Sequence, residues 1–165
     1  MLKEQDIAVA VRLTQPESAS LTYPSLGAAL RISASEAHAA VRRATESGLL
    51  DRSRAPRNSS LLEFLVHGIK YAFPGVWKGI TRGIPTSIGA PPLSFSFGTS
   101  EFPPVWPYAN GTARGEGLVP LYRSAPEAAL RDPILYEWLA LIDAVRSGRA
   151  RERQLAVAEF KRRLS

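Results

Sequence analysis

Apolar residues recur at helical spacing in three segments of the first 60 residues. The first segment covers about Lys3 to Leu13, and the second covers Tyr23 to Leu30 after a break over residues 16–22. The third covers residues 34–47, and its inward positions follow i, i+3, i+4, i+7 spacing at Ala37, Ala40, Val41 and Ala44. This pattern predicts three short amphipathic helices in close succession.

Punctuating residues support the limits of the third helix. Ser33 can accept a hydrogen bond from the first turn, and Glu36 three residues later completes a capping-box pattern. Gly48 follows the last residue and suits a left-handed helix stop. Gly27, in the second helix, supplies the small residue that two closely crossing helices need. Together these residues predict a helix-turn-helix.

The polar side of the third helix carries the candidate DNA contacts. At about 100° per residue, Ser35, His38 and Arg42 point away from the apolar stripe, with Arg43 at its flank. A small polar first turn followed by arginine is typical of a helix that enters the major groove. The next segment predicts a short strand over 48–52 and then a basic wing over 53–58, which together hold three arginines: Arg52, Arg54 and Arg57.

Residues Leu26 to Leu50 resemble the helix-turn-helix of winged helix-turn-helix transcriptional regulators, broadly of the MarR-like kind, with their Gly-Leu-Leu sequence before the wing. The resemblance covers about residues 3–60. It implies contacts with DNA from the third helix by Ser35, His38, Arg42 and Arg43, and from the wing by Arg52, Arg54 and Arg57. This chain departs from the pattern in two ways, because Glu46 shares the exposed face and the wing is short.

Composition changes sharply after the next predicted helix, Leu61 to Phe73. Residues 74–125 hold eight of the 13 prolines and eight of the 12 glycines, together with seven aromatic residues. Such density excludes long helices and disfavours regular central strands, while the aromatics favour ordered extended chain packed on something. Two further helices are predicted over Pro133 to Arg146 and Arg149 to Leu164.

The expected fold is therefore mainly α. A winged helix-turn-helix domain over residues 1–60 precedes a second region, 61–165, made of a helix, a proline-rich wrap and C-terminal helices. The helices over 61–73 and 133–146 carry more apolar surface than one small core needs. This excess predicts a homodimer, with region 61–165 serving dimerisation or partner binding.

Two segments of the middle region suggest anion or partner contacts. Thr81 to Thr86 places Arg82 and two hydroxyls in a predicted tight loop, and Gly111 to Gly117 is a glycine-rich stretch that contains Arg114. The second stretch lacks the phosphate-loop pattern. The alternative for both is an ordered structural loop. A third segment, Pro103 to Tyr108, is typical of polyproline II chain with aromatic anchors.

Charge and residue content narrow the function. The chain has 165 residues, with 21 Lys and Arg against 15 Asp and Glu, a net charge of +6 that favours a polyanionic partner. With no cysteine and only two histidines, it offers no disulfides or thiolate chemistry, and we expect no metal and no cofactor. We expect no enzyme either, because no catalytic triad, supported carboxylate pair or zinc-hydrolase motif is present.

The sequence also predicts where the protein is located and what it does. No uncharged apolar run reaches the roughly 18 residues that a membrane helix needs, and no signal-peptide core follows the N-terminus, so a cytoplasmic protein is predicted. The predicted function is sequence-specific binding of double-stranded DNA by a dimeric transcriptional regulator. The alternative is an antitoxin or accessory protein that neutralises a partner enzyme, such as a toxin, and regulates its own operon. For a simple regulator, Trp77, Trp106 and Tyr122 should pack on the chain's own helices.

Overall fold

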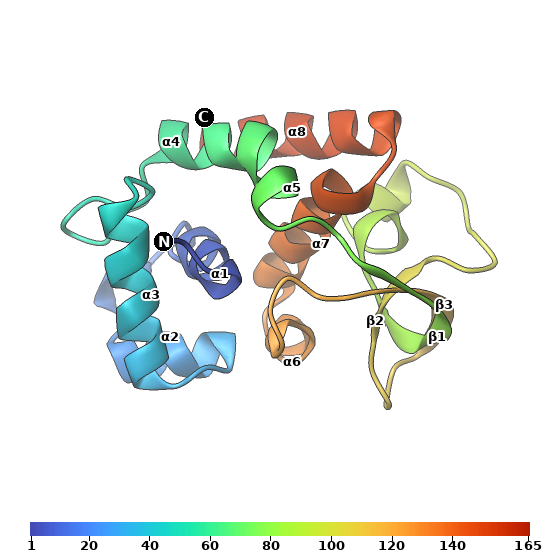
Figure 1. Ribbon diagram of the computed structural model, residues 1–165, viewed down its shortest axis with the longest axis horizontal. Coiled ribbons are helices and arrows are strands. Elements are labelled where there is room, and N and C mark those ends of the chain that lie inside the picture. Colours follow the sequence, from blue (N-terminus) through green and yellow to red (C-terminus); the bar gives the residue numbers. More distant parts are fainter.

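The computed structural model describes residues 1–165 without a gap (Figure 1). Helices α1, α2 and α3 form an N-terminal group at one end of the long axis, and three short strands lie at the other end. The bounds are α1 Glu4–Arg12, α2 Tyr23–Leu30, α3 Ala34–Glu46, α4 Asn58–Glu63, α5 Ile69–Ala72, β1 Trp77–Pro85, β2 Pro104–Pro107, β3 Ala113–Leu118, α6 Ala125–Arg131, α7 Pro133–Ser147 and α8 Ala150–Leu164. A π-helical turn, Phe64–Gly68, joins α4 to α5.

The N-terminal helices form where the pattern predicted them. Ser33 caps α3 by accepting a hydrogen bond from the Glu36 amide at 3.0 Å, and Gly48 has a φ of 86°. The reciprocal half of the capping box is absent, because the Glu36 carboxylate accepts from Gln5 instead. A Cβ on Gly27 would lie 2.7 Å from the Ile32 carbonyl oxygen, so the turn between α2 and α3 does require glycine there.

The predicted wing is wrong. After α3 the chain makes one tight turn over residues 51–57, closed by a single bridge between Leu50 and Pro56, and no wing strand forms. The Asp51 carboxylate accepts hydrogen bonds from the amides of Ser53 and Ala55 at 2.8 and 3.0 Å. Because a side chain captures these amides and Pro56 has no N–H, few donors are left for a hairpin ladder.

The mainly α fold class is also wrong, because the proline- and glycine-rich middle builds a small closed barrel of three strands. Strand β1 pairs antiparallel with both β2 and β3, and β2 pairs parallel with β3. Glycine lets these backbones approach closely: a Cβ on Gly83 would lie 1.9 Å from the Trp106 carbonyl oxygen, and one on Gly115 would lie 1.8 Å from that of Pro103. The chain is therefore a mixed α/β fold.

The two segments that were predicted as loops form strands of this barrel. Most of the stretch from Thr81 to Thr86 lies in β1, and most of the stretch from Gly111 to Gly117 lies in β3. The expected polyproline segment contains β2, whose prolines stand at its two ends, Pro104 and Pro107. Proline at a strand end leaves the intervening residues free to pair, which is why its density did not prevent a sheet.

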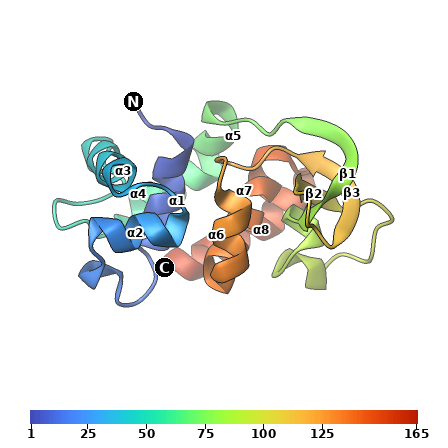
Figure 2. The same cartoon turned by 90° about the horizontal axis from the view of Figure 1, so that it is seen from below.

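Helix α7 is the centre of the molecule (Figures 1 and 2). One continuous apolar core runs from α1 to α8 and crosses the predicted boundary at residue 60. Helix α7 has its N-terminus capped by Asp132, which accepts from the Leu135 amide at 3.1 Å. It buries nine of its residues, among them Trp138, Leu139 and Asp143.

Asp143 fastens the barrel to α7. Its carboxylate is 1% exposed and accepts hydrogen bonds, each 2.7 Å long, from the Thr86 hydroxyl, the Trp106 indole and the Arg146 guanidinium. Burial raises the pKa of Asp143, while the charge of Arg146 and the hydrogen bonds act in the opposite direction. Arg146 also donates to the Phe73 carbonyl at 2.7 Å, so the approach to β1 is tied to the same group.

The surfaces on which the dimer prediction was based lie inside one chain. Leu61, Leu65 and Ile69 are fully buried, and Leu139 is 1% exposed. Helices α6 and α8, the turn Ser87–Gly89 after β1 and Trp106 of β2 contact α7, and α8 also contacts α4. None of the helices combines the length and the apolar character that a membrane-crossing helix requires.

Candidate nucleic-acid interface

Helix α3 presents a polar face to solvent at the end of the molecule farthest from the barrel (Figure 1). Ser35, His38 and Arg42 are all exposed, and their spacing of three and four residues puts them on one side of the helix. The opposite side is buried against α1 and α2 through Ala37, Ala40, Val41 and Ala44. We call Ser35, His38 and Arg42 the α3 face.

Arg43 does not belong to this face. Its guanidinium makes two hydrogen bonds of 2.8 Å with the carboxylate of Asp6, which is fully buried on α1. Asp6 also accepts from the Lys3 amide at 2.8 Å. The hydrogen bonds that Arg43 donates to the Asp6 carboxylate raise the pKa of Arg43. The pair joins α1 to α3 and fixes how α3 is presented.

Arg54 is likewise used inside the protein. Its guanidinium donates to the carbonyls of Leu21 and Ala19 at 2.6 and 3.2 Å and lies 5.3 Å from the centre of the Tyr23 ring. The Tyr23 ring in turn meets the His38 ring edge-on, with centroids 4.7 Å apart. Arg54 therefore anchors the 51–57 turn to the segment before α2, and Tyr23 orients the imidazole of His38.

The 51–57 turn is held rigid and leaves two arginines free. The Ser53 hydroxyl donates to Asp51 at 2.6 Å, and this bond lowers the pKa of Asp51. Arg52 and Arg57 are exposed and form no ion pair. Arg42 on the α3 face is also exposed and also forms none. Three guanidinium groups without an ion-pair partner, those of Arg42, Arg52 and Arg57, thus lie at one end of the molecule.

Two acidic residues also lie on α3. Glu36 is occupied by its hydrogen bond from Gln5, while Glu46, one turn beyond Arg42, is exposed and forms no ion pair. Glu46 therefore places an unpaired negative charge at the C-terminal end of α3, next to the 51–57 turn.

Sequence reasoning missed the two residues that organise this interface, Asp6 and Tyr23. A signal for Asp6 was present, because an acid three residues after Lys3 and directly before five consecutive apolar residues can hardly avoid burial. An acid buried in this way requires a cation. No comparable pattern marked Tyr23.

The other candidate residues, Arg82 and Arg114, lie at the opposite end of the molecule. They are directly opposite each other on β1 and β3, so the structure brings together two arginines that are 32 positions apart in the chain. Neither one approaches the α3 face (Figures 1 and 2).

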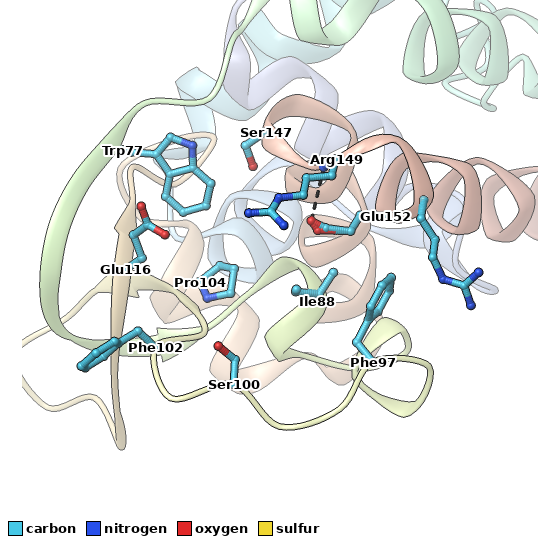
Figure 3. Close-up of a pocket in the computed structure, with 11 residues that line it drawn as sticks. Trp77, Ile88, Phe97, Ser100, Phe102, Pro104, Glu116, Ser147, Arg149 and Glu152 are labelled. Atoms are coloured by element: carbon cyan, nitrogen blue, oxygen red, sulfur yellow. Dashed lines mark hydrogen bonds between the residues drawn. The ribbon is translucent and has the colours of Figure 1, made fainter.

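The aromatics of the middle region divide into two groups. Trp106 and Tyr122 are 1% and 8% exposed, as predicted for residues that pack on the chain's own helices. The same prediction is wrong for Trp77, which is 41% exposed. Together with Phe102, which is 42% exposed, Trp77 borders a groove of about 630 Å³ between the barrel and the start of α8. Figure 3 shows the Arg149 guanidinium pointing into this groove between Trp77 and Ile88.

Comparison of the chain with family models, curated proteins and solved structures finds no match.

Proposed function

We propose that this protein binds double-stranded DNA through the α3 face and the 51–57 turn. The observation that carries the proposal is the division of the local arginines. Arg43 and Arg54 make internal contacts, whereas Arg42, Arg52 and Arg57 are exposed and take part in no ion pair, although Arg57 is near enough to Asp51 to lower the pKa of that carboxylate. A rigid surface with free guanidinium groups suits the fixed spacing of DNA phosphates.

The α3 face would lie in the major groove. Ser35 and His38, in the first half of α3, would meet base edges, and Arg42 would reach a base or the adjacent phosphate. Arg52 and Arg57 would contact the backbone from the turn, without any wing strand. Sequence-specific reading then requires α3 to keep its angle, which Asp6 and Arg43 maintain.

We further propose that the protein acts in the cytoplasm as a transcriptional regulator, without an enzymatic activity of its own, and that two copies read two half-sites. One small module buries little groove surface, so a homodimer would raise affinity. Leu61, Leu65, Ile69 and most of the apolar residues of α7 are buried within one chain, so such a dimer would use the side chains that stay exposed, among them Tyr71 and Ile134. Light scattering at micromolar concentration, with and without DNA, tests it, and a monomer in both samples would contradict the dimer.

The DNA test is fluorescence anisotropy with a labelled duplex from the region upstream of the gene. We expect Arg42→Ala and the double variant Arg52→Ala/Arg57→Ala each to weaken binding by about tenfold or more, and to flatten its salt dependence by about one unit of slope per lost phosphate contact. Arg151→Ala, which removes an exposed arginine at the other end of the chain, is the matched control. An absence of binding at low salt, or equal losses in Arg42→Ala and Arg151→Ala, would refute the proposal.

A second candidate function, binding of a partner protein by an antitoxin or accessory subunit, is favoured by the groove in Figure 3. Trp77, the first residue of β1, and Phe102, two residues before β2, line this groove together with Arg149, and such a mixture of aromatics and arginine is typical of protein interfaces. The groove and the α3 face are at opposite ends, so both could be used at once.

The test is co-expression with the product of the co-transcribed neighbouring gene. Trp77→Ala/Phe102→Ala should abolish co-purification of the two proteins, while Arg42→Ala should leave it intact. Retention of the partner by the aromatic double variant would exclude this groove.

A further inference from the structure

Arg82 and Arg114 form a cross-strand pair on the barrel. They are register partners in the antiparallel pairing of β1 with β3, so their side chains project from the same face with Cβ atoms about 5 Å apart. Both side chains are exposed, and both line one hollow of about 580 Å³. We call this feature the Arg82–Arg114 hollow.

No carboxylate neutralises the pair. The only other polar side chains of the hollow are the hydroxyls of Thr81 and Thr112, and neither arginine takes part in any ion pair of the structure. The nearest acid in the pairing register, Glu116, is two residues beyond Arg114 on β3. Figure 3 shows Glu116 beside Trp77 in the neighbouring groove. The hollow therefore carries two positive charges.

The backbone fixes the spacing of the two arginine positions on the barrel. A Cβ on Gly111 would lie 2.3 Å from the backbone of Gly83, so the chain after β2 is pressed against β1 next to Arg82. Like charges directly opposite each other destabilise a strand pair, and the close backbone contact between Gly111 and Gly83 disfavours a shift of the strands that would relieve the repulsion. A local arrangement that costs stability in the free protein is expected where a ligand uses it.

We propose that the Arg82–Arg114 hollow binds a phosphate group. Two guanidinium groups on one face can each offer paired N–H donors to a tetrahedral oxyanion, and the Thr112 hydroxyl can donate to a remaining oxygen, whereas the Thr81 hydroxyl donates to the Arg82 carbonyl. A phosphate monoester carries a charge of about −1.5 to −2 near neutral pH, which matches the charge of the hollow. The phosphate belongs either to a small molecule or to the backbone of a nucleic acid. The proposal does not depend on DNA binding at α3, because the two sites are at opposite ends of the molecule (Figure 1).

Isothermal titration calorimetry with inorganic phosphate, in buffers matched for ionic strength with chloride, tests the proposal. We expect saturable binding by the full chain and at least a tenfold loss in Arg82→Gln/Arg114→Gln. Arg82→Lys/Arg114→Lys keeps the charge but not the paired donors, so it should bind more weakly than the natural chain and more tightly than the glutamine variant. Arg151→Gln should bind like the natural chain.

Thermal unfolding supplies an independent readout that shows whether the variants fold. Without phosphate, Arg114→Gln should unfold at the same temperature as the natural chain or a higher one, because the repulsion is gone. With phosphate, the rise in unfolding temperature should be larger in the natural chain than in the variant, beyond the general salt effect that both share. Equal rises in the two proteins, together with equal calorimetric affinity, would overturn the proposal.

A single-stranded oligothymidylate of about ten nucleotides distinguishes the sources. Binding that is lost in Arg82→Gln/Arg114→Gln and retained in Arg42→Ala assigns the hollow to a nucleic-acid backbone. Binding of inorganic phosphate alone assigns it to a small phosphorylated ligand. Neither result depends on duplex binding at α3, so failure here and failure of the proposed function can be told apart.

Discussion

Both ends of this protein contain a fully buried aspartate that holds an arginine, yet the two pairs have different tasks. At the N-terminal end, Asp6 accepts from the Lys3 amide at the start of α1 and from Arg43 of α3, so it connects two helices that already have their own apolar stripes. At the barrel end, Asp143 collects donors from a helix, a strand and a loop, through Arg146, Trp106 and Thr86. The first pair adjusts an angle between elements, whereas the second assembles the barrel against α7.

This difference teaches where each end is vulnerable. The helices α1, α2 and α3 are specified by neighbours within a few residues, so removing a long-range contact should loosen their packing without melting them. The strands are short, rich in glycine and proline, and have little local preference for the structure they adopt. Their order depends on the contacts that Asp143 organises.

The largest effect is expected from Asp143→Ala. Three buried donors lose their acceptor, and Arg146 becomes a buried cation without a partner, which should lower the free energy of unfolding by about 4 kcal/mol. Asp143→Asn keeps one acceptor oxygen and should cost less. Urea unfolding followed by tryptophan fluorescence measures both, and a value for Asp143→Ala within about 1 kcal/mol of the natural chain would show that the barrel does not depend on this group.

Arg43→Ala should come next, with a loss of about 3 kcal/mol, because Asp6 is left buried and charged without its partner. Arg42→Ala, its neighbour on the exposed side, should leave stability close to that of the natural chain. The free energy of unfolding of each variant, measured in urea, tests whether Arg43 stabilises the fold and Arg42 does not. Equal stability losses in both variants would contradict that difference.

Gly115→Ala should destabilise by about 2 kcal/mol or more, since the new methyl group would overlap the Pro103 carbonyl in a barrel that cannot widen. Gly98→Ala is the matched control, because nothing lies within 4 Å of a Cβ at that position. Differential scanning calorimetry of the pair tests whether the strands pack as closely as the structure indicates. An unchanged melting temperature in Gly115→Ala would mean that they do not.

The smallest effect is expected from Tyr122→Phe. Its hydroxyl donates to the Leu30 carbonyl at 2.9 Å and links the segment before α6 to α2, so its removal should cost about 1 kcal/mol. Burial also raises the pKa of Tyr122, which keeps this donor protonated at high pH. Tyr71→Phe, at a largely exposed position, should leave the free energy of unfolding in urea unchanged. Equal free energies of unfolding in the two variants would show that the Tyr122 hydroxyl does not stabilise the protein.

The helices and their limits could be predicted from the amino-acid order because their causes are local. The predicted bounds of α2, Tyr23 to Leu30, are those observed, and Asp132 with Pro133 marked the start of α7. Caps, stops and apolar stripes act within one or two turns of the chain. The exposure of Ser35, His38 and Arg42 follows from the same helical period.

Only the tertiary structure determined that the strands form a barrel and which partner each arginine binds. The strands can pair because Gly83 and Gly115 have no side chain and let backbone from distant segments come close. No local sequence preference predicts such a contact. Arg43 and Arg42 are adjacent and chemically identical, yet only Arg43 is withdrawn from the surface, by an aspartate 37 residues away. An arginine binds whichever carboxylate, carbonyl or phosphate the folded chain brings within reach, and that choice is made by geometry over long sequence distances.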